Sequence, residues 1–148
     1  MRTLATNKKA LFDYQILDKH EAGLVLSGGE VKSAKAAHLS LKGSFVTIHD
    51  NEFYLTNATI TKYPFSNPHH AYDPSRSRKL LLKKAEIKSL IGKMQVKGLT
   101  LVPLRVYTKG RLVKLEFALA RGKKTYDKRS DIAKKEAQRK MERAIKNN

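Results

Sequence analysis

Apolar and polar side chains alternate in two stretches of the first half of the chain, a pattern typical of β-strands. The first stretch is Asp13–Lys19, and we expect the strand formed there to be broken at Gly23. The second is 45–60, where apolar residues lie on both sides of Asp50-Asn51, a pair that favours a tight turn. The pattern therefore predicts a strand followed by a β-hairpin.

The same alternation predicts a second hairpin in the last third of the chain. Its strands are expected over Thr100–Tyr107 and Leu112–Ala120, with a turn around Lys109-Gly110. The apolar residues of this hairpin that we expect in the core are Val106, Val113, Leu115, Phe117 and Leu119.

Two helices are expected among the strands. Glu30–Ala37 follows Gly28-Gly29, and Lys83–Lys97 is the longer segment. Apolar residues of the longer segment recur at i, i+3, i+4 and i+7, on one helical face: Ile87, Leu90, Ile91 and Met94. Antiparallel strands with two or three added helices favour a mainly β fold. We expect a closed or nearly closed barrel of the OB type, which binds oligonucleotides on its outer face and loops.

The C-terminal residues differ from this body in charge and in pattern. Residues 121–148 carry 11 Lys and Arg against 4 Asp and Glu, whereas residues 1–120 carry 20 against 9. On a helix, mostly small apolar residues would form one thin stripe: Ala133, Ala137, Met141 and Ala144. Such a stripe buries too little area to offset an ordering cost of about 1–2 kcal/mol per residue. The sequence thus predicts a basic lead over 1–9, a barrel over 10–123, and a flexible, disordered tail over 124–148 that becomes helical against a larger partner.

Charge then narrows the class of partner. The 148 residues include 31 Lys and Arg against 13 Asp and Glu, a net charge of +18. A polyanion relieves the self-repulsion of such a chain, and the candidates are nucleic acid, an anionic membrane or an acidic protein. A membrane-bound helix needs large apolar side chains on one face. The chain has no Trp and its most basic segment is poor in such residues, so nucleic acid is favoured.

Other features of the composition exclude several classes of protein. The absence of cysteine excludes disulfides, thiol catalysis and thiolate metal sites. No apolar run approaches the roughly 18 residues of a membrane-spanning helix, and Met1–Lys9 lacks the apolar segment of a secretory signal. We therefore expect a cytoplasmic protein.

The segment from Gly28 to Lys35 is the first candidate for chemistry. A glycine pair before a helix leaves backbone N–H groups available to phosphate, and Lys32 and Lys35 share a helical face. Glu30 would repel phosphate. It could instead accept hydrogen bonds from base amino groups, hold a nearby lysine or arginine, or simply favour the helix N-terminus through the dipole.

Two further segments are basic. The first, 67–84, contains two prolines and a cluster of Arg76, Arg78 and Lys79, and arginine suits phosphate because its planar fork donates to two oxygens. His69-His70 suggests a metal site, but adjacent histidines diverge and no third ligand follows at a fixed spacing, so no metal is expected.

The second basic segment is 121–129. Gly122-Lys123 lacks the upstream glycine of a nucleotide-binding phosphate loop. It therefore predicts either a glycine hinge before basic residues and a stacking ring at Tyr126, or only a solvated run of charge. No catalytic set is present in the sequence, so we expect neither an enzyme nor a cofactor.

Taken together and in this order, several segments resemble the small protein B family, the SsrA-binding proteins of bacterial trans-translation. The segments are Asn7-Lys8-Lys9-Ala10, Glu21–Leu26, Glu30–Ser33, Asp73–Leu82, Gly122–Lys124 and Asp127–Arg129. The resemblance implies an OB-type barrel, monomeric when free, that binds the tRNA-like domain of transfer-messenger RNA and stands in for the missing anticodon arm. It also implies entry into stalled ribosomes, where the tail becomes helical in the empty mRNA channel near the decoding centre.

The resemblance also implies which residues act. The RNA-binding residues would be Asn7, Lys8, Lys9, Glu30, Lys32, Ser33, Lys35, Arg76, Arg78 and Lys79. The tail residues that face the ribosome would be Gly122, Lys123, Lys124, Tyr126, Asp127, Lys128 and Arg129. Lys35 replaces the arginine usual in the family, which keeps the charge but loses the bidentate fork. Lys83 stands where many members have histidine.

Two alternatives remain open at the level of sequence. A general single-strand or ribosomal RNA-binding barrel would bind unstructured oligonucleotides as well as it binds a folded RNA. An RNA-modifying enzyme would need a pocket with perturbed titratable groups.

Overall fold

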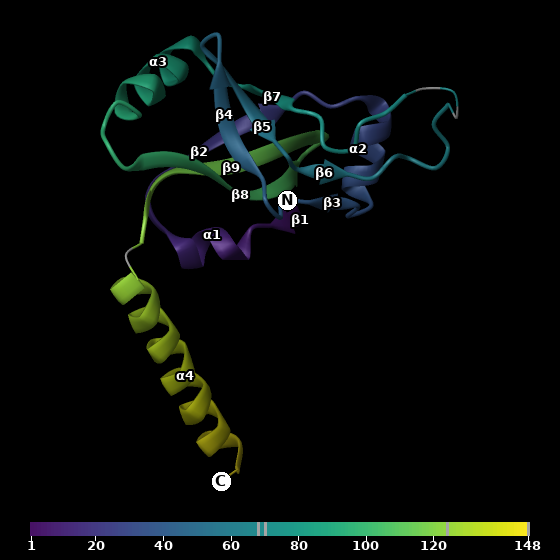
Figure 1. Cartoon of the computed structure of the whole chain (residues 1–148). Helices are drawn as coiled ribbons and strands as arrows, with labels where there is room; N and C mark the ends of the chain where they lie inside the picture. Colours follow the sequence, from purple (N-terminus) through teal and green to yellow (C-terminus); the bar gives the residue numbers. More distant parts are fainter. Residues whose placement is uncertain (68, 70, 124, 148) are drawn as a thin grey trace.

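The computed structural model describes residues 1–67, 69, 71–123 and 125–147, and Figure 1 shows a curled sheet with helices at its margins. In chain order the elements are β1 (Arg2–Thr6), α1 (Lys8–Asp13), β2 (Tyr14–Leu24), α2 (Gly28–Lys35), β3 (Leu39–Ser40), β4 (Phe45–His49), β5 (Glu52–Thr56), β6 (Thr59–Ile60), β7 (Arg78–Leu81), α3 (Lys84–Lys93), β8 (Leu99–Lys109), β9 (Leu112–Gly122) and α4 (Thr125–Asn147). None of the described helices is long and apolar enough to cross a membrane.

Seven strands form one sheet in the order β1-β8-β9-β2-β7-β5-β4, and every pairing in it is antiparallel. This confirms the mainly β fold with added helices. The sheet curls far enough to bring its edge strand β4 against β8. No ladder joins the two ends among the described residues, so the structure shows a curled sheet, and closure into the expected closed or nearly closed barrel is not confirmed.

Both predicted hairpins are present. β4 and β5 meet at Asp50 and Asn51, which have φ of 50° and 59°, the left-handed conformation that two-residue hairpin turns require. The first hairpin ends at Thr56, earlier than expected, because Thr59–Ile60 leaves it to pair with Leu39–Ser40. β8 and β9 turn at Gly110, whose φ of +61° favours glycine.

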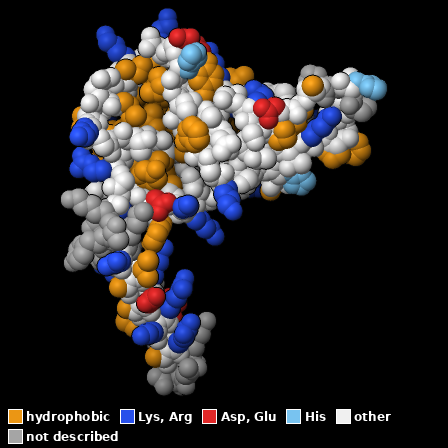
Figure 2. All heavy atoms as spheres, viewed as in Figure 1, with side chains coloured by type: hydrophobic (Ala, Val, Ile, Leu, Met, Phe, Trp, Pro, Cys, Tyr) orange, Lys and Arg blue, Asp and Glu red, His pale blue; other side chains and the backbone are white. Residues whose placement is uncertain are grey.

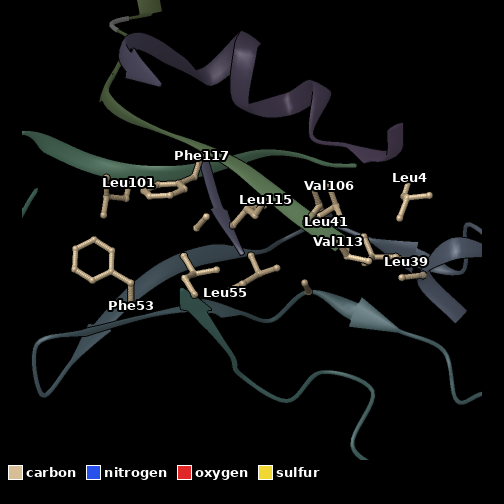
Figure 3. Close-up of a cluster of buried hydrophobic side chains, with 14 of the residues drawn as sticks. Leu4, Leu39, Leu41, Phe53, Leu55, Leu101, Val106, Val113, Leu115 and Phe117 are labelled. Carbon is tan, nitrogen blue, oxygen red and sulfur yellow. The ribbon is translucent and has the colours of Figure 1, made fainter. Parts of the chain in front are cut away.

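The core lies inside the curl of the sheet. Figure 3 shows Phe53 and Leu55 of β5 opposite Leu101 and Phe117 of β8 and β9. All five core residues expected from the second hairpin are buried: Val106, Val113, Leu115, Phe117 and Leu119. Leu90 of α3 is also buried against this cluster, and three partly buried residues of the same helical face accompany it, as the periodicity predicted: Ile87, Ile91 and Met94.

Two expectations for the first 24 residues are wrong. Gly23 does not break β2, since it pairs with both Lys114 and Leu81. A side chain at Gly23 would lie 3.4 Å from Leu81, so glycine permits the close approach of β7 here. The basic lead is not a separate segment either, because β1 is an edge strand of the sheet that pairs with β8.

The tail also departs from its prediction. Residues expected to be disordered form α4, a helix of 23 residues that projects from the body (Figure 1). The physical reason is local, since Ala, Lys, Arg, Glu and Gln dominate this segment and all are strong helix formers. The members of the predicted apolar stripe are exposed, Met141 by 65%, so the body does not cover the stripe of α4.

Candidate nucleic-acid interface

α2 begins in a reciprocal capping arrangement between Ser27 and Glu30. The Glu30 N–H donates to Ser27 Oγ at 3.3 Å, and the Ser27 N–H donates to Glu30 Oε1 at 3.0 Å. This capping box satisfies two backbone donors that a helix start leaves unpaired. The arrangement fixes Glu30 on the inner side of α2, where its side chain is 1% exposed.

Two arginines from the segment before and within β7 converge on the Glu30 carboxylate. Arg78 donates to Oε2 through Nε at 2.9 Å and through Nη2 at 2.7 Å. Arg76 donates to Oε2 through Nε at 3.1 Å and also contacts Oε1. One carboxylate therefore joins α2 to β7 and to the loop that precedes it.

Arg78 is completely buried and directs its remaining hydrogen bonds to the backbone. Nη1 donates to the Ala58 carbonyl at 2.6 Å, and Nη2 donates to the Pro74 carbonyl at 2.9 Å. The Tyr72 hydroxyl lies 3.1 Å from Nη2 and itself donates to the Ile60 carbonyl at 2.7 Å. We call Glu30, Tyr72, Arg76 and Arg78 the Glu30 network.

The charge state of Glu30 follows from two opposing effects. Burial alone would raise its pKa, but hydrogen bonds from Arg76, the Ser27 N–H and Arg78 outweigh it and lower the pKa to about 2. The carboxylate is therefore ionised at neutral pH, and its acceptor sites are already used within the protein.

Three of the residues predicted to contact RNA are buried in this conformation. They are Glu30, Ser33 and Arg78, whose side chains do not reach the surface. Of the roles left open for Glu30, the structure supports the helix start and the holding of an arginine. It does not support hydrogen bonds to base amino groups.

The other predicted residues of this region do reach the surface. Lys32 is exposed, Lys35 is half-buried, and the Arg76 side chain remains 38% exposed at the edge of the Glu30 network. Lys79 is exposed as well, but it alternates with Arg78 on β7 and forms a surface ion pair with Glu52 at 3.0 Å.

A second basic group surrounds the start of α1. Lys8 and Lys9 are exposed, whereas Asn7 accepts from the Ala10 N–H at 3.3 Å and donates to the Pro103 carbonyl at 2.9 Å. Asn7 therefore caps α1 and fastens it to β8. A hollow of about 420 Å³ adjoins Lys8 and Lys9, and exposed Lys42 also lines it.

The start of the tail is fastened to the end of α1. The Lys123 N–H donates to the Asp13 carbonyl at 2.9 Å, and Lys123 Nζ donates to the Leu11 carbonyl at 3.2 Å. These carbonyls lie in the last turn of a helix, where a positive charge is favourable. Lys123 thus fixes the point from which the tail leaves the body.

The remaining predicted tail residues are placed only in part. Gly122 is exposed at the end of β9, and Lys124 lies outside the described residues. Tyr126, Asp127 and Lys128 fall in the first turns of α4, and Arg129 is exposed there. Figure 2 shows Lys and Arg on the visible face of the body and along α4, where apolar side chains follow one edge of the helix. No group of acidic or histidine side chains in the described part of the chain could hold a metal ion.

A comparison with protein families decides which family carries this arrangement. A family model described as SmpB protein matches residues 4–147. The chain belongs to the SmpB family. The match covers all of α4, both basic groups and the curled sheet except the first residues of β1, so the resemblance found in separate motifs extends over nearly the whole fold.

Individual relatives agree with the family model. An SsrA-binding protein of Chloroflexus aggregans is 50% identical over 143 residues, which cover 97% of this chain and 90% of that protein. An SsrA-binding protein of Sulfurihydrogenibium sp. is 51% identical over 146 residues, 98% of this chain and 95% of that protein. A solved structure described as "tmRNA-SmpB: a journey to the center of the bacterial ribosome" contains a chain 46% identical, with a TM-score of 0.65. The alignment covers 81% of this chain and 84% of that one.

Two features of this candidate interface were not predicted from the sequence. Lys42 carries no motif, and only the fold brings it to the hollow beside Lys8 and Lys9. The position of Lys123 against α1 was also missed, because α1 itself was not predicted. The signal for α1 was present in Asn7, an N-cap residue type just before Lys8-Lys9-Ala10.

Proposed function

We propose that this protein binds transfer-messenger RNA through its tRNA-like domain and carries it to stalled ribosomes in trans-translation. The observation that supports this function most strongly is membership of the SmpB family over residues 4–147, together with 46% identity to a chain of the tmRNA–SmpB structure on the bacterial ribosome. A net charge of +18 is consistent with a polyanionic partner.

In this proposal the body recognises RNA through exposed cations held at fixed positions. Lys8, Lys9, Lys32, Lys35 and Arg76 contact phosphates or bases, because these side chains reach the surface. Glu30, Ser33 and Arg78 act as positioning residues, and Asn7 sets the direction of α1. We further infer that the curled sheet corresponds to an OB-type barrel, whose outer face and loops suit RNA of a fixed shape.

The tail has a separate role in the proposal. The protein stands in for the anticodon arm that the partner RNA lacks, and α4 enters the decoding centre and the empty mRNA channel of the small subunit. The exposed apolar stripe of α4 and its basic residues support this role, because ribosomal RNA can cover both. The protein acts without catalysis of its own and in the cytoplasm, where ribosomes work.

Recovery of the bound RNA from bacterial cells tests the function. We expect affinity-purified full-length protein to be enriched in transfer-messenger RNA over transfer RNA and ribosomal RNA, measured by sequencing. Lys32→Glu should reduce this enrichment, whereas Lys88→Glu, the same charge change on exposed α3, should leave it near the wild-type value. Recovery of ribosomal RNA or unstructured messages in proportion to their abundance would instead support the general RNA-binding alternative.

A further inference from the structure

The loop after β6 displays an aromatic side chain that the fold does not use. Phe65 is 85% exposed, the most exposed aromatic residue among the large apolar side chains of the described structure. Its ring lies 5.5 Å from that of Tyr63, with an interplanar angle of 67°. This edge-to-face contact is a favourable geometry for two aromatic rings, and most of the Phe65 side chain remains accessible beside it.

The loop holds these two rings in place through local contacts. The Ser66 N–H donates to the Tyr63 carbonyl at 3.1 Å, and the Ser66 hydroxyl donates to the same carbonyl at 2.7 Å. In the sequence Pro64 separates Tyr63 from Phe65, and its ring restricts the backbone φ at that position. A turn that is closed before binding loses little conformational entropy when a ligand arrives.

Tyr63 is in turn held against α2. A Cβ at Gly29 would lie 3.5 Å from Tyr63 Cβ, an ordinary van der Waals distance, so the loop packs directly against the helix start. Lys32 Nζ lies 5.1 Å from the centre of the Tyr63 ring, a cation–π distance. The aromatic pair is therefore joined to the same helix that carries the Glu30 network.

The surroundings of the pair favour a nucleic-acid ligand over an apolar protein surface. A hollow of about 200 Å³ beside Tyr63 is lined by Ser27, Gly29, Glu30, Lys62, Tyr63, Ser66 and Tyr72. Lys32 and Lys62 are both exposed next to it. Aromatic faces beside lysines suit a nucleotide, since the ring stacks on the base while the cations meet the phosphates.

We propose that Phe65, which packs against Tyr63, is a stacking platform for one unpaired nucleobase of the bound RNA, with Lys32 over the Tyr63 ring for the neighbouring phosphate. This inference rests on the proposed function, because it assigns a new contact to the same RNA. Stacking on one aromatic side chain is worth about 1–3 kcal/mol per base. The site recognises a base by its shape and by contact with its π-face, so it discriminates unpaired from paired nucleotides.

The test compares ring loss with ring retention. We expect Phe65→Leu and Tyr63→Leu to weaken binding of a transcript of the tRNA-like domain about tenfold, within the range for one stacked base. Phe65→Tyr should bind like wild type. All three should keep the wild-type slope of log affinity against log salt, because no phosphate contact is lost, whereas Lys32→Ala should reduce the slope by about one. The Phe65 variants should also keep the wild-type melting temperature, because that side chain is exposed.

A base analogue gives a direct readout. With 2-aminopurine placed in turn at each unpaired position of the transcript, we expect wild type and Phe65→Tyr to quench one position that Phe65→Leu leaves bright. The proposed stacking is contradicted if wild type binds the transcript and both leucine variants bind it with an affinity within twofold of wild type. It is also contradicted if the salt slope of the leucine variants falls. If wild type itself fails to bind the transcript, the proposed function and this inference fail together.

Discussion

Glu30→Ala is expected to destabilise the folded protein by about 3–5 kcal/mol, a large part of the roughly 5–15 kcal/mol typical of a domain. The substitution leaves the completely buried Arg78 without its carboxylate partner, and it removes one half of the capping box of α2. Urea unfolding followed by circular dichroism measures the change. The family resemblance implied a contact of Glu30 with RNA, whereas its burial makes stability of the fold the property that this variant should change most.

Two matched variants separate burial from charge. Glu52→Ala breaks the ion pair with Lys79, whose partners are 43% and 44% exposed, and should cost only about 0–1 kcal/mol. Replacing both Glu30 and Arg78 by leucine should cost less than Glu30→Ala, because no buried charge is left alone. Equal effects of Glu30→Ala and Glu52→Ala would show that the Glu30 network does not carry the stability assigned to it.

Lowering the pH should cause part of the same loss of folding stability in the wild-type protein. The pKa of Glu30 is lowered from an ordinary 4.5 to about 2 in the folded protein, so the unfolded chain takes up the proton first as pH falls. The stability that this group contributes is fully present above about pH 4.5 and is lost between pH 4.5 and 2. The difference in unfolding free energy between wild type and Glu30→Gln should therefore narrow over that interval.

Truncation after Lys123 is expected to abolish tagging of nascent chains on stalled ribosomes. At about 0.15 M salt, the affinity for the tRNA-like domain should change by less than about threefold. The shortened protein keeps the contacts of Lys123 with Asp13 and Leu11, which truncation after Gly122 would remove. It loses α4, the element that we assign to the ribosome. A reconstituted trans-translation reaction and an RNA titration measure the two outcomes.

Ala137→Pro is the matched control for the loss of charge that truncation brings. It keeps every basic residue of the tail but places proline inside α4, where it costs about 3 kcal/mol of helix stability. We expect full RNA affinity and strongly reduced tagging. A loss of RNA affinity of more than about tenfold in either variant, about 1.4 kcal/mol, would contradict the division between body and tail.

The hairpins could be predicted because their signals are local. The turn at Asp50-Asn51 and the one at Gly110 each join strands with clear alternation, and both form where expected. The apolar face of α3 could likewise be predicted, because its apolar residues recur with the period of a helix. α1 and β1 could not be recognised in this way, because six helical residues and an edge strand are too short for a periodic pattern.

The tail shows a different limit of sequence reasoning. A thin apolar stripe, set against the cost of ordering the chain, predicted disorder. Helix propensity opposes this within the segment, and it needs no contact with the body. Met141, which belongs to the predicted stripe, is 65% exposed, so the body leaves that part of the stripe open, but the disorder predicted for the tail is not confirmed.

The candidate interface depended on tertiary structure. The basic residues were all visible in the sequence, but only the fold distinguishes exposed Arg76 from buried Arg78, two residues apart on the same segment. Alternation along β7 explains the difference, because Arg78 and Leu80 face the core while Lys79 faces solvent. The pairing partner of a charged residue lies far away in sequence, so composition alone could not assign Glu30 its role.

A competition titration at one fixed salt concentration tests the central claim most directly. Labelled tRNA-like domain of transfer-messenger RNA is bound to the full-length protein and displaced either by the same RNA unlabelled or by an unstructured oligonucleotide of equal length. We predict that the folded RNA competes at least about tenfold better, a difference of about 1.4 kcal/mol. Equal competition by the two RNAs would contradict recognition of a tRNA-like shape and leave only a basic protein that binds any RNA.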